Sequence, residues 1–316
     1  VGPQAGIFTA IVAGFVISAF GGSSVQIAGP TAAFATIVAG IVAKDGLDGL
    51  IISTILAGIF LILMGICRLG SLIKFIPYTI TTGFTSGIAV TIVIGQLKDF
   101  FGVTYPNGLK PIETMEKLNA FALGFSSFHV DALIVGGVSL AILIISPYIF
   151  KRIPGSLIAV VIGILMVKFL PLHVSTIGNL YTITNDLPSF HIPAVKFSMV
   201  KSAIPNAFTI AVLAAIESLL SCVVADSMVN SRHRSNMELI AQGAGNITSA
   251  LFGGIPATGA IARTAANIKN GGRTPIAGMV HSVVLLLILV VLMPYAALIP
   301  MPVSYTHLTL PTNSRV

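Results

Sequence analysis

The amino-acid sequence predicts an all-α protein that crosses a membrane several times. Of its 316 residues, 55% are hydrophobic and only 9% are charged, and the mean hydropathy is +0.99. Ordinary soluble domains carry about a quarter charged residues, so a soluble fold of this size would lack a sufficient polar surface. The apolar residues also form blocks of about 17 to 25 positions, the length of a helix that crosses a hydrocarbon layer. A repeated motif predicts two inverted halves.

Eight apolar blocks are long enough to form membrane-spanning helices. Their approximate ranges are 1–20, 48–66, 77–97, 130–149, 154–170, 204–225, 237–252 and 275–293. Two further segments, at about 30–43 and 258–268, are too short to cross, and each follows a Gly-rich extended stretch. We expect these two segments to be half-helices preceded by short strands. A β-barrel is not expected, because its strands would appear as alternating segments of about ten residues.

The two short segments belong to the repeated motif. The block 1–20 ends in Phe-Gly-Gly at residues 20–22, and the block 237–252 ends in the same three residues at 252–254. In each copy, a strand-like stretch and a half-helix follow. Seven crossings separate the copies, an odd number, so the second copy is inverted relative to the first. Inverted repeats with broken helices in matching positions are typical of alternating-access transporters.

The two half-helices predict a binding site for a small anion. A helix that begins at mid-membrane leaves its first N–H groups unpaired and carries about half a positive charge at that end. Two such ends that face each other would bind an anion between them. We expect the first end to contribute Thr31, whose hydroxyl can donate, and Ala32. The second end would contribute Gly259, where the backbone can come close, and Ala260.

Two charged residues fall within these membrane segments. Arg263 lies one turn into the second half-helix, where a guanidinium that faces lipid would cost about 3 kcal/mol or more. We expect it to face the anion, although a permanent pair with Glu217 or snorkelling towards the helix end would also explain it. Glu217 is interpreted as the only carboxylate deep inside an apolar block, with Ser221 on the same face at i+4. Burial favours its protonated form, so it could carry a proton or simply bond a neighbouring helix.

The remaining residues give no sign of catalysis or metal binding. The six histidines show no metal-ligand spacing, and Cys67 and Cys222 lie in apolar segments without zinc-like spacing. The sequence contains no P-loop, Gly-x-Ser-x-Gly motif or pair of catalytic carboxylates. We therefore expect no enzyme activity, no cofactor and no metal site. The net charge is +7, but the basic residues are scattered between apolar blocks, so a nucleic-acid partner is not expected.

Three polar residues near the second repeat have simple structural interpretations. Gln242 and Asn246 are spaced i and i+4 in the block 237–252 and are expected to hydrogen-bond a neighbouring helix. His233 lies between Arg232 and Arg234 and is interpreted as a loop residue.

Residues 215–278 resemble the sulfate permease (SulP) family of anion transporters. They contain AIESLL at 215–220, NSRHRSNMELIAQGAGNI at 230–247 and FGGIPATGAIARTAANIKNGGRTPIAG at 252–278, and QIAGPTAAF at 26–34 matches the first half-helix of the family. The resemblance covers about residues 1–302 and implies a seven-plus-seven inverted-repeat transporter fold of a core domain and a gate domain. By this comparison the chain holds the second to the eleventh segments, without the first, the last three and the STAS domain usual in the family.

The resemblance also implies domain boundaries. The core would comprise roughly residues 1–75 and 204–293, and the gate roughly residues 76–170. Residues 303–316 change abruptly to a polar, Thr-rich run and are interpreted as a non-native tail.

The resemblance implies secondary active transport of a small inorganic anion across the cytoplasmic (inner) membrane. Sulfate is the first candidate, with bicarbonate or chloride as alternatives. The family comparison implies that Thr31, Ala262 and Arg263 contact the anion and that Glu217 with Ser221 binds the coupling ion. Glu217 stands where a sodium-coupled bicarbonate member has Asp, which favours a proton over sodium. Ala262 lacks the hydroxyl of the Ser found in many relatives, which weakens the case for sulfate.

Other functions and partners remain open at this stage. A nucleobase carrier of the same fold is one alternative, although such carriers place acidic residues near the site and this sequence has an arginine there. A passive anion channel is a second alternative. The expected partners are the anion, a proton or sodium, membrane lipid and, as an open question, a second copy of the chain.

Overall fold

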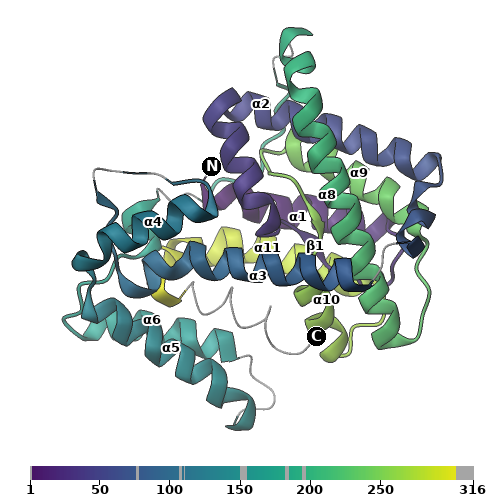
Figure 1. Ribbon diagram of the computed structural model, residues 1–316. Helices are drawn as coiled ribbons and strands as arrows, with labels where there is room; N and C mark the ends of the chain where they lie inside the picture. Colours follow the sequence, from purple (N-terminus) through teal and green to yellow (C-terminus); the bar gives the residue numbers. More distant parts are fainter. Residues whose placement is uncertain are drawn as a thin grey trace. The chain divides into compact units, whose positions relative to one another are not determined.

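The structure is a computed structural model that describes residues 2–75, 78–106, 109, 111–149, 155–181, 185–193 and 197–303. Helices make up most of the described chain (Figure 1). In order, the elements are α1 (Pro3–Phe20), β1 (Ala28–Gly29), α2 (Ala33–Ile66), η1 (Leu69–Phe75), α3 (Tyr78–Phe101), α4 (Thr114–Gly124), η3 (Phe125–Ser127), α5 (Val130–Ile149), α6 (Gly155–Phe169), α7 (Ile177–Leu180), α8 (Phe197–Val229), α9 (Ser235–Leu251), β2 (Thr258–Gly259), α10 (Ile261–Lys269) and α11 (Pro275–Ala296).

The chain divides into two compact units, each assembled from segments that are far apart in the sequence. The first unit comprises Val1–Thr82 and Asn185–Val291, and the second comprises Gly83–Thr184 and Leu292–Val316. Both copies of the Phe-Gly-Gly motif therefore lie in the first unit. All the residues predicted to bind an anion or a coupling ion also belong to this unit.

Four described helices are long and apolar enough to cross a membrane. They are Pro3–Phe20, Ala33–Ile66, Met199–Val229 and Pro275–Ala296, and the bent pair Thr114–Ser127 with Val130–Ser146 would make a fifth crossing. The prediction of an all-α polytopic membrane protein is therefore confirmed. Hydropathy locates these helices correctly because a helix that crosses lipid needs about 20 consecutive apolar residues.

Helical structure also occurs outside the predicted apolar blocks. The helix α8 begins at Phe197 rather than near residue 204, and α4 forms between the blocks 77–97 and 130–149. Hydropathy marks where the membrane begins and not where a helix begins, so polar helical turns outside the apolar blocks are missed. A reciprocal capping box between Glu113 and Glu116 stabilises the start of α4.

Both predicted half-helices begin directly after a short strand. The strands β1 and β2 pair antiparallel, with Ala28 opposite Gly259 and Gly29 opposite Thr258. The helices α2 and α10 start two to four residues later, so no helix runs through either strand. The prediction of two broken helices preceded by strands is confirmed. Inside α2, Gly46 has φ 70° and ψ −170°, a non-helical conformation that joins the first half-helix to the next span through a kink.

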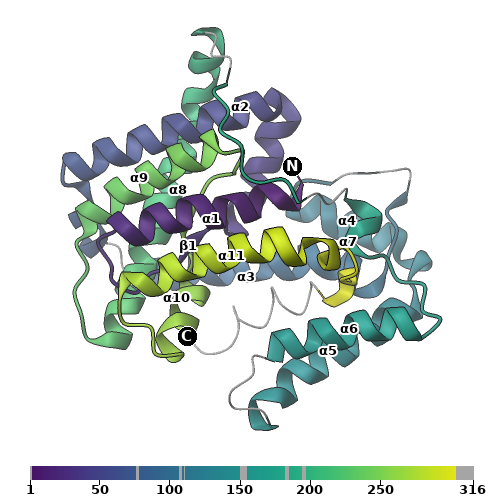
Figure 2. The ribbon, with the colours of Figure 1, turned by 180° about the vertical axis from the view of Figure 1, so that it is seen from behind.

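Glycines allow α9 to pack closely in the first unit, where it lies between α2 and α1 (Figure 2). A Cβ atom on Gly58 of α2 would lie 2.6 Å from the carbonyl oxygen of Gly243 on α9. A Cβ atom on Gly243 would in turn collide with the carbonyl oxygen of Gly58. Small residues at such crossings let helix backbones approach each other in a membrane, where the hydrophobic effect provides no attraction between helices.

Replacing Gly243 with leucine is expected to destabilise the first unit. The new side chain would push α9 away from α2, and overpacking of this kind typically costs about 1 to 3 kcal/mol. Thermal unfolding in detergent should therefore occur at a lower temperature. Gly40→Leu is the matched control, because a Cβ at that position of α2 meets no atom within 4 Å apart from the adjacent backbone of its own helix. Equal unfolding temperatures for the two variants would contradict this account of the packing.

The second unit contains α5 and α6, which pack against each other (Figure 1). The segment after α11 returns to this unit, and Val303 is fully buried there beside Val135 and Val174. Residues 304–316, which make up the rest of the predicted tail, lie outside the described residues.

Candidate anion-binding site

The paired strands bring the starts of α2 and α10 together. Next to this two-stranded sheet, the Ala260 N–H donates to the carbonyl oxygen of Ile27 at 3.0 Å. Ala32 precedes α2 and Ala260 precedes α10, and neither helix start has a side-chain cap. No side chain therefore closes either helix start, although at the start of α2 the N–H groups of Phe34 and Ala35 donate to the carbonyl oxygens of Thr31 at 3.2 Å and Ala32 at 3.0 Å.

Arg263 reaches from α10 to the start of the other half-helix. Its Nη2 donates to the carbonyl oxygen of Pro30 at 3.0 Å, and the side chain is exposed. The guanidinium lies against Gly29, where a Cβ atom would be 2.6 Å from Nη1. Among the described residues, the ion pairs join histidines to Asp131 and Asp226, so the permanent pair with Glu217 that the sequence left open is not formed.

Glu217 is connected to the first half-helix by a hydrogen bond. Its side chain on α8 is only 6% exposed, and its Oε2 accepts a bond of 2.9 Å from the Thr31 hydroxyl. The hydroxyl that we expected to donate to an anion therefore donates to this carboxylate. The candidate coupling residue and the candidate anion site are in direct contact.

Ser221 faces a different partner from Glu217. Its hydroxyl donates to Thr264 Oγ1 on α10 at 3.3 Å, and Thr264 also accepts a bond of 3.0 Å from the Ile27 N–H. Ser221 and Thr264 thus connect α8 to both the second half-helix and the segment that enters β1.

The absence of a side chain at Gly259 also has a packing reason. Gly259 and Ala260 are buried, whereas Ala262 is half-buried. A Cβ atom on Gly259 would collide with the side-chain amide of Gln26 and would lie 3.1 Å from the Cα of Ser218. The missing side chain therefore makes room for Gln26, which donates from Nε2 to Ser218 Oγ at 2.9 Å.

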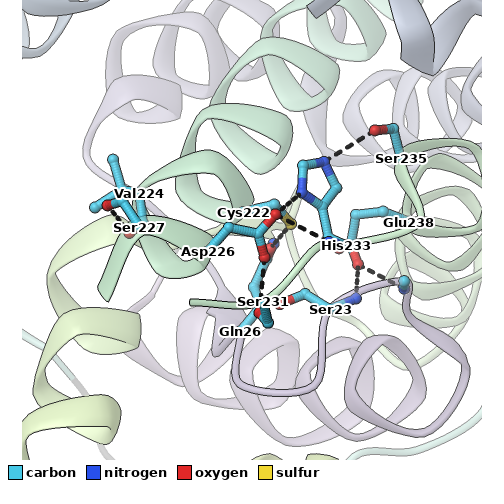
Figure 3. A network of polar contacts seen from close by, with 11 residues as sticks. Ser23, Gln26, Cys222, Val224, Asp226, Ser227, Ser231, His233, Ser235 and Glu238 are labelled. Atoms are coloured by element: carbon cyan, nitrogen blue, oxygen red, sulfur yellow. Dashed lines mark hydrogen bonds and ion pairs between the residues drawn. The ribbon is translucent and has the colours of Figure 1, made fainter. Parts of the chain in front are cut away.

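A second carboxylate in the core, Glu238, was missed by the sequence analysis. It is fully buried near the start of α9, so Glu217 is not the only such group. The carboxylate accepts bonds from the backbone N–H groups of Gly22 and Ser23 (Figure 3). It also accepts bonds from the side chains of Ser218 and Gln242. Its place beside a basic loop suggests a surface residue. One feature of the sequence could have indicated its burial: Gln242 and Asn246 lie on the same helix face as Glu238, at i+4 and i+8.

His233 is also more buried than its loop position suggests. Its side chain is only 7% exposed, and Nδ1 lies 2.7 Å from Asp226 Oδ2. Its Nε2 lies 2.9 Å from the hydroxyl of Ser235, the first residue of α9 (Figure 3). The imidazole thus connects the end of α8 to the start of α9.

Comparison with protein families matches residues 1–303 to the Sulfate permease family. The chain belongs to this family. YvdB of Bacillus subtilis, provisionally named a sulfate transporter, is 43% identical over 95% of this chain and 56% of its own length. The bicarbonate transporter BicA of Picosynechococcus sp. is 34% identical over 96% of this chain and 55% of its own. The chain thus spans about half the length of these relatives.

Solved structures agree on the fold. The transmembrane domain of a cyanobacterial bicarbonate transporter BicA superposes with a TM-score of 0.85 at 31% identity, over 98% of this chain and 81% of that chain. The structure of SLC26A9 superposes with a TM-score of 0.82 at 20% identity, over 99% of this chain and 53% of that chain, and this match concerns the fold alone. The family member described here therefore has the seven-plus-seven inverted-repeat fold. The relatives named above carry the names of transporters and not of enzymes, which agrees with the expectation that this chain is not an enzyme.

Proposed function

We propose that this SulP-family chain forms the membrane-embedded part of a secondary active transporter for a small inorganic anion in the cytoplasmic membrane. The observation that carries this proposal is the meeting of two uncapped helix starts beside paired strands, with Arg263 extending from one to the other. The anion would lie against Thr31 and Ala32 on one side and against Gly259, Ala260 and Ala262 on the other.

The electrostatics of this region favour a negative ligand. Each helix start contributes about half a positive charge, and the guanidinium adds a full one. Arginine carries five N–H donors, and only one bond, to Pro30, is formed within the described chain. The remaining donors of this exposed side chain can meet the oxygens of an oxyanion, which a guanidinium binds in a bidentate manner.

Sulfate is our first candidate substrate and bicarbonate our second. Of the relatives named above, YvdB is provisionally named a sulfate transporter and BicA is a bicarbonate transporter. Both anions present several oxygens to helix N-termini and a guanidinium. Ala262 offers no hydroxyl, so recognition would depend on backbone N–H groups and Arg263.

A proton is the proposed coupling ion, with Glu217 as its carrier. Moving an anion into a negative interior costs about 2.3 kcal/mol per charge at 100 mV, so net uptake needs a compensating ion. Glu217 contacts Thr31 directly, and its charge state can therefore influence the first half-helix. A glutamate in place of the aspartate of the sodium-coupled relative favours a proton, and Ser221 donates its hydroxyl to Thr264.

The two compact units suggest how alternating access would work. We propose that the first unit is the core domain that carries the anion and that the second unit is the gate domain. The first unit comprises Val1–Thr82 and Asn185–Val291, and the core expected from the sequence comprises roughly residues 1–75 and 204–293.

Uptake into proteoliposomes tests this function. The full-length protein is reconstituted, and the uptake of labelled sulfate, bicarbonate and uracil is measured with and without an inward proton gradient. We expect saturable anion uptake that the proton gradient accelerates, and no uptake of uracil. Saturable uracil uptake would favour a nucleobase carrier, and unsaturable anion flux without coupling would favour a channel.

A further inference from the structure

The helix α9 carries a buried row of three polar side chains, Glu238, Gln242 and Asn246. They are spaced four residues apart, which puts them on one helix face, and all three are 0% exposed. Gln242 Nε2 donates to Glu238 Oε1 at 3.0 Å, and Asn246 Nδ2 donates to the carbonyl oxygen of Gln242 at 2.8 Å. The three residues, called the α9 row below, therefore form a continuous hydrogen-bonded line inside the first unit.

One end of the α9 row holds the segment that leads to β1. Glu238 Oε2 accepts bonds from the N–H groups of Gly22 at 2.8 Å and Ser23 at 3.3 Å (Figure 3). Both donors are backbone groups, so the carboxylate acts on the position of the chain and not on one side chain. Five residues after Ser23 the chain enters β1.

The other end of the α9 row holds the segment that leads to β2. Asn246 Oδ1 accepts a bond of 2.9 Å from the Ala257 N–H, and its Nδ2 donates to the carbonyl oxygen of the same residue at 2.9 Å. Ala257 immediately precedes β2. The side-chain amide supplies one donor and one acceptor to the same residue, as a neighbouring strand would, and neither aspartate nor leucine could supply both.

Glu238 also connects the α9 row to α8 at the level of Glu217. Ser218, the next residue after Glu217, donates to Glu238 Oε1 at 3.1 Å and accepts the bond from Gln26. The carboxylate thus accepts four hydrogen bonds from three parts of the first unit. An ionisable residue buried in a membrane protein is costly, so a purpose beyond packing is expected.

The strand pair itself is too short to fix the relative position of the half-helices. It consists of two residues on each side, whereas an isolated two-stranded ribbon is marginal even at greater length. The α9 row hydrogen-bonds the segments that lead into both strands. Its two contact points, Glu238 and Asn246, lie on one helix, eight residues or about 12 Å apart along the helix axis.

We propose that the α9 row sets the relative position of the α2 and α10 starts, with Glu238 and Asn246 as positioning residues of the anion site. This inference rests on the proposed function for the identity of the ligand. Neither residue touches the anion. Each acts through the backbone that enters a strand.

The test combines hydrogen exchange with uptake kinetics in the full-length protein. The variants are Glu238→Leu, which removes all four accepted bonds, and Asn246→Leu, which removes both bonds to Ala257. Thr248→Ala is the matched control on α9, because its hydroxyl bonds only carbonyl oxygens of its own helix. If Asn246→Leu does not fold, Asn246→Asp replaces it, since it still accepts from the Ala257 N–H.

We expect amides in residues 22–29 and 255–260 to exchange at least about ten times faster in both row variants than in the control. The KM for sulfate or bicarbonate should rise by about tenfold or more, with kcat changed much less, because the helix starts are displaced and not removed. Unchanged exchange at the strands would overturn the proposal. Faster exchange throughout the first unit with an unchanged KM would also overturn it, because the row would then only stabilise the fold. If the wild type takes up neither anion, the proposed function fails, while exchange at the strands still decides the positioning role.

Discussion

Arg263→Ala is expected to abolish saturable anion uptake while the protein still inserts and folds. The guanidinium carries a full positive charge and lies between the starts of the two half-helices, where it bonds Pro30. Its side chain is exposed, so a ligand can reach it. Hydrogen bonds to a charged group contribute about 1.5 to 3 kcal/mol each, so the loss of two would reduce kcat/KM by at least about a hundredfold. Uptake of labelled sulfate and bicarbonate into proteoliposomes measures the effect.

Two further variants make this result specific. Arg273→Ala is the matched control, because Arg273 bonds the carbonyl oxygens of Ile268 and Gly272 beyond the anion site, and its uptake should stay close to wild type. Arg263→Lys keeps the charge but loses the planar fork, so an intermediate KM is expected. Uptake by Arg263→Ala with an unchanged KM would mean that the guanidinium serves only to bond Pro30.

Glu217→Gln is expected to remove the acceleration of uptake by external acid while anion exchange is retained. In the proposed cycle, the carboxylate takes up a proton when the site is open to the outside and releases it inside. Glutamine resembles the protonated form and cannot release a proton, so a cycle that needs the release stops. Exchange of one anion for another needs no proton release and should continue. The measurement is initial uptake and exchange at several external pH values with a constant internal pH.

The control for this prediction is Asp48→Asn, which neutralises an exposed carboxylate on α2. Its response to external acid should match that of the wild type. Wild-type uptake that follows a sodium gradient and ignores pH would contradict the proton assignment. It would instead indicate that Glu217 with Ser221 forms a sodium site.

The half-helices could be predicted from the sequence because their signals are local. The Phe-Gly-Gly motif, the Gly-rich entry and the short apolar run lie within about 25 consecutive residues in each copy. The polar partners could not be predicted in this way. Glu217 and Ser221 share a helix face at i+4, yet they stand about 6 Å apart along the axis. This distance lets one residue meet Thr31 and the other meet Thr264.

Glu238 illustrates the same division between local and tertiary information. Its position near a basic loop resembles that of a surface carboxylate, and only the packing of α9 between α2 and α1 buries it. The sequence by itself determined the membrane class, the inverted repeat and the two breaks in the helices, because hydropathy and glycine act over short stretches of chain. The tertiary structure alone decided which hydroxyl, amide and backbone groups meet. Those bonds join residues as far as 237 positions apart, and their partners depend on how the helices pack.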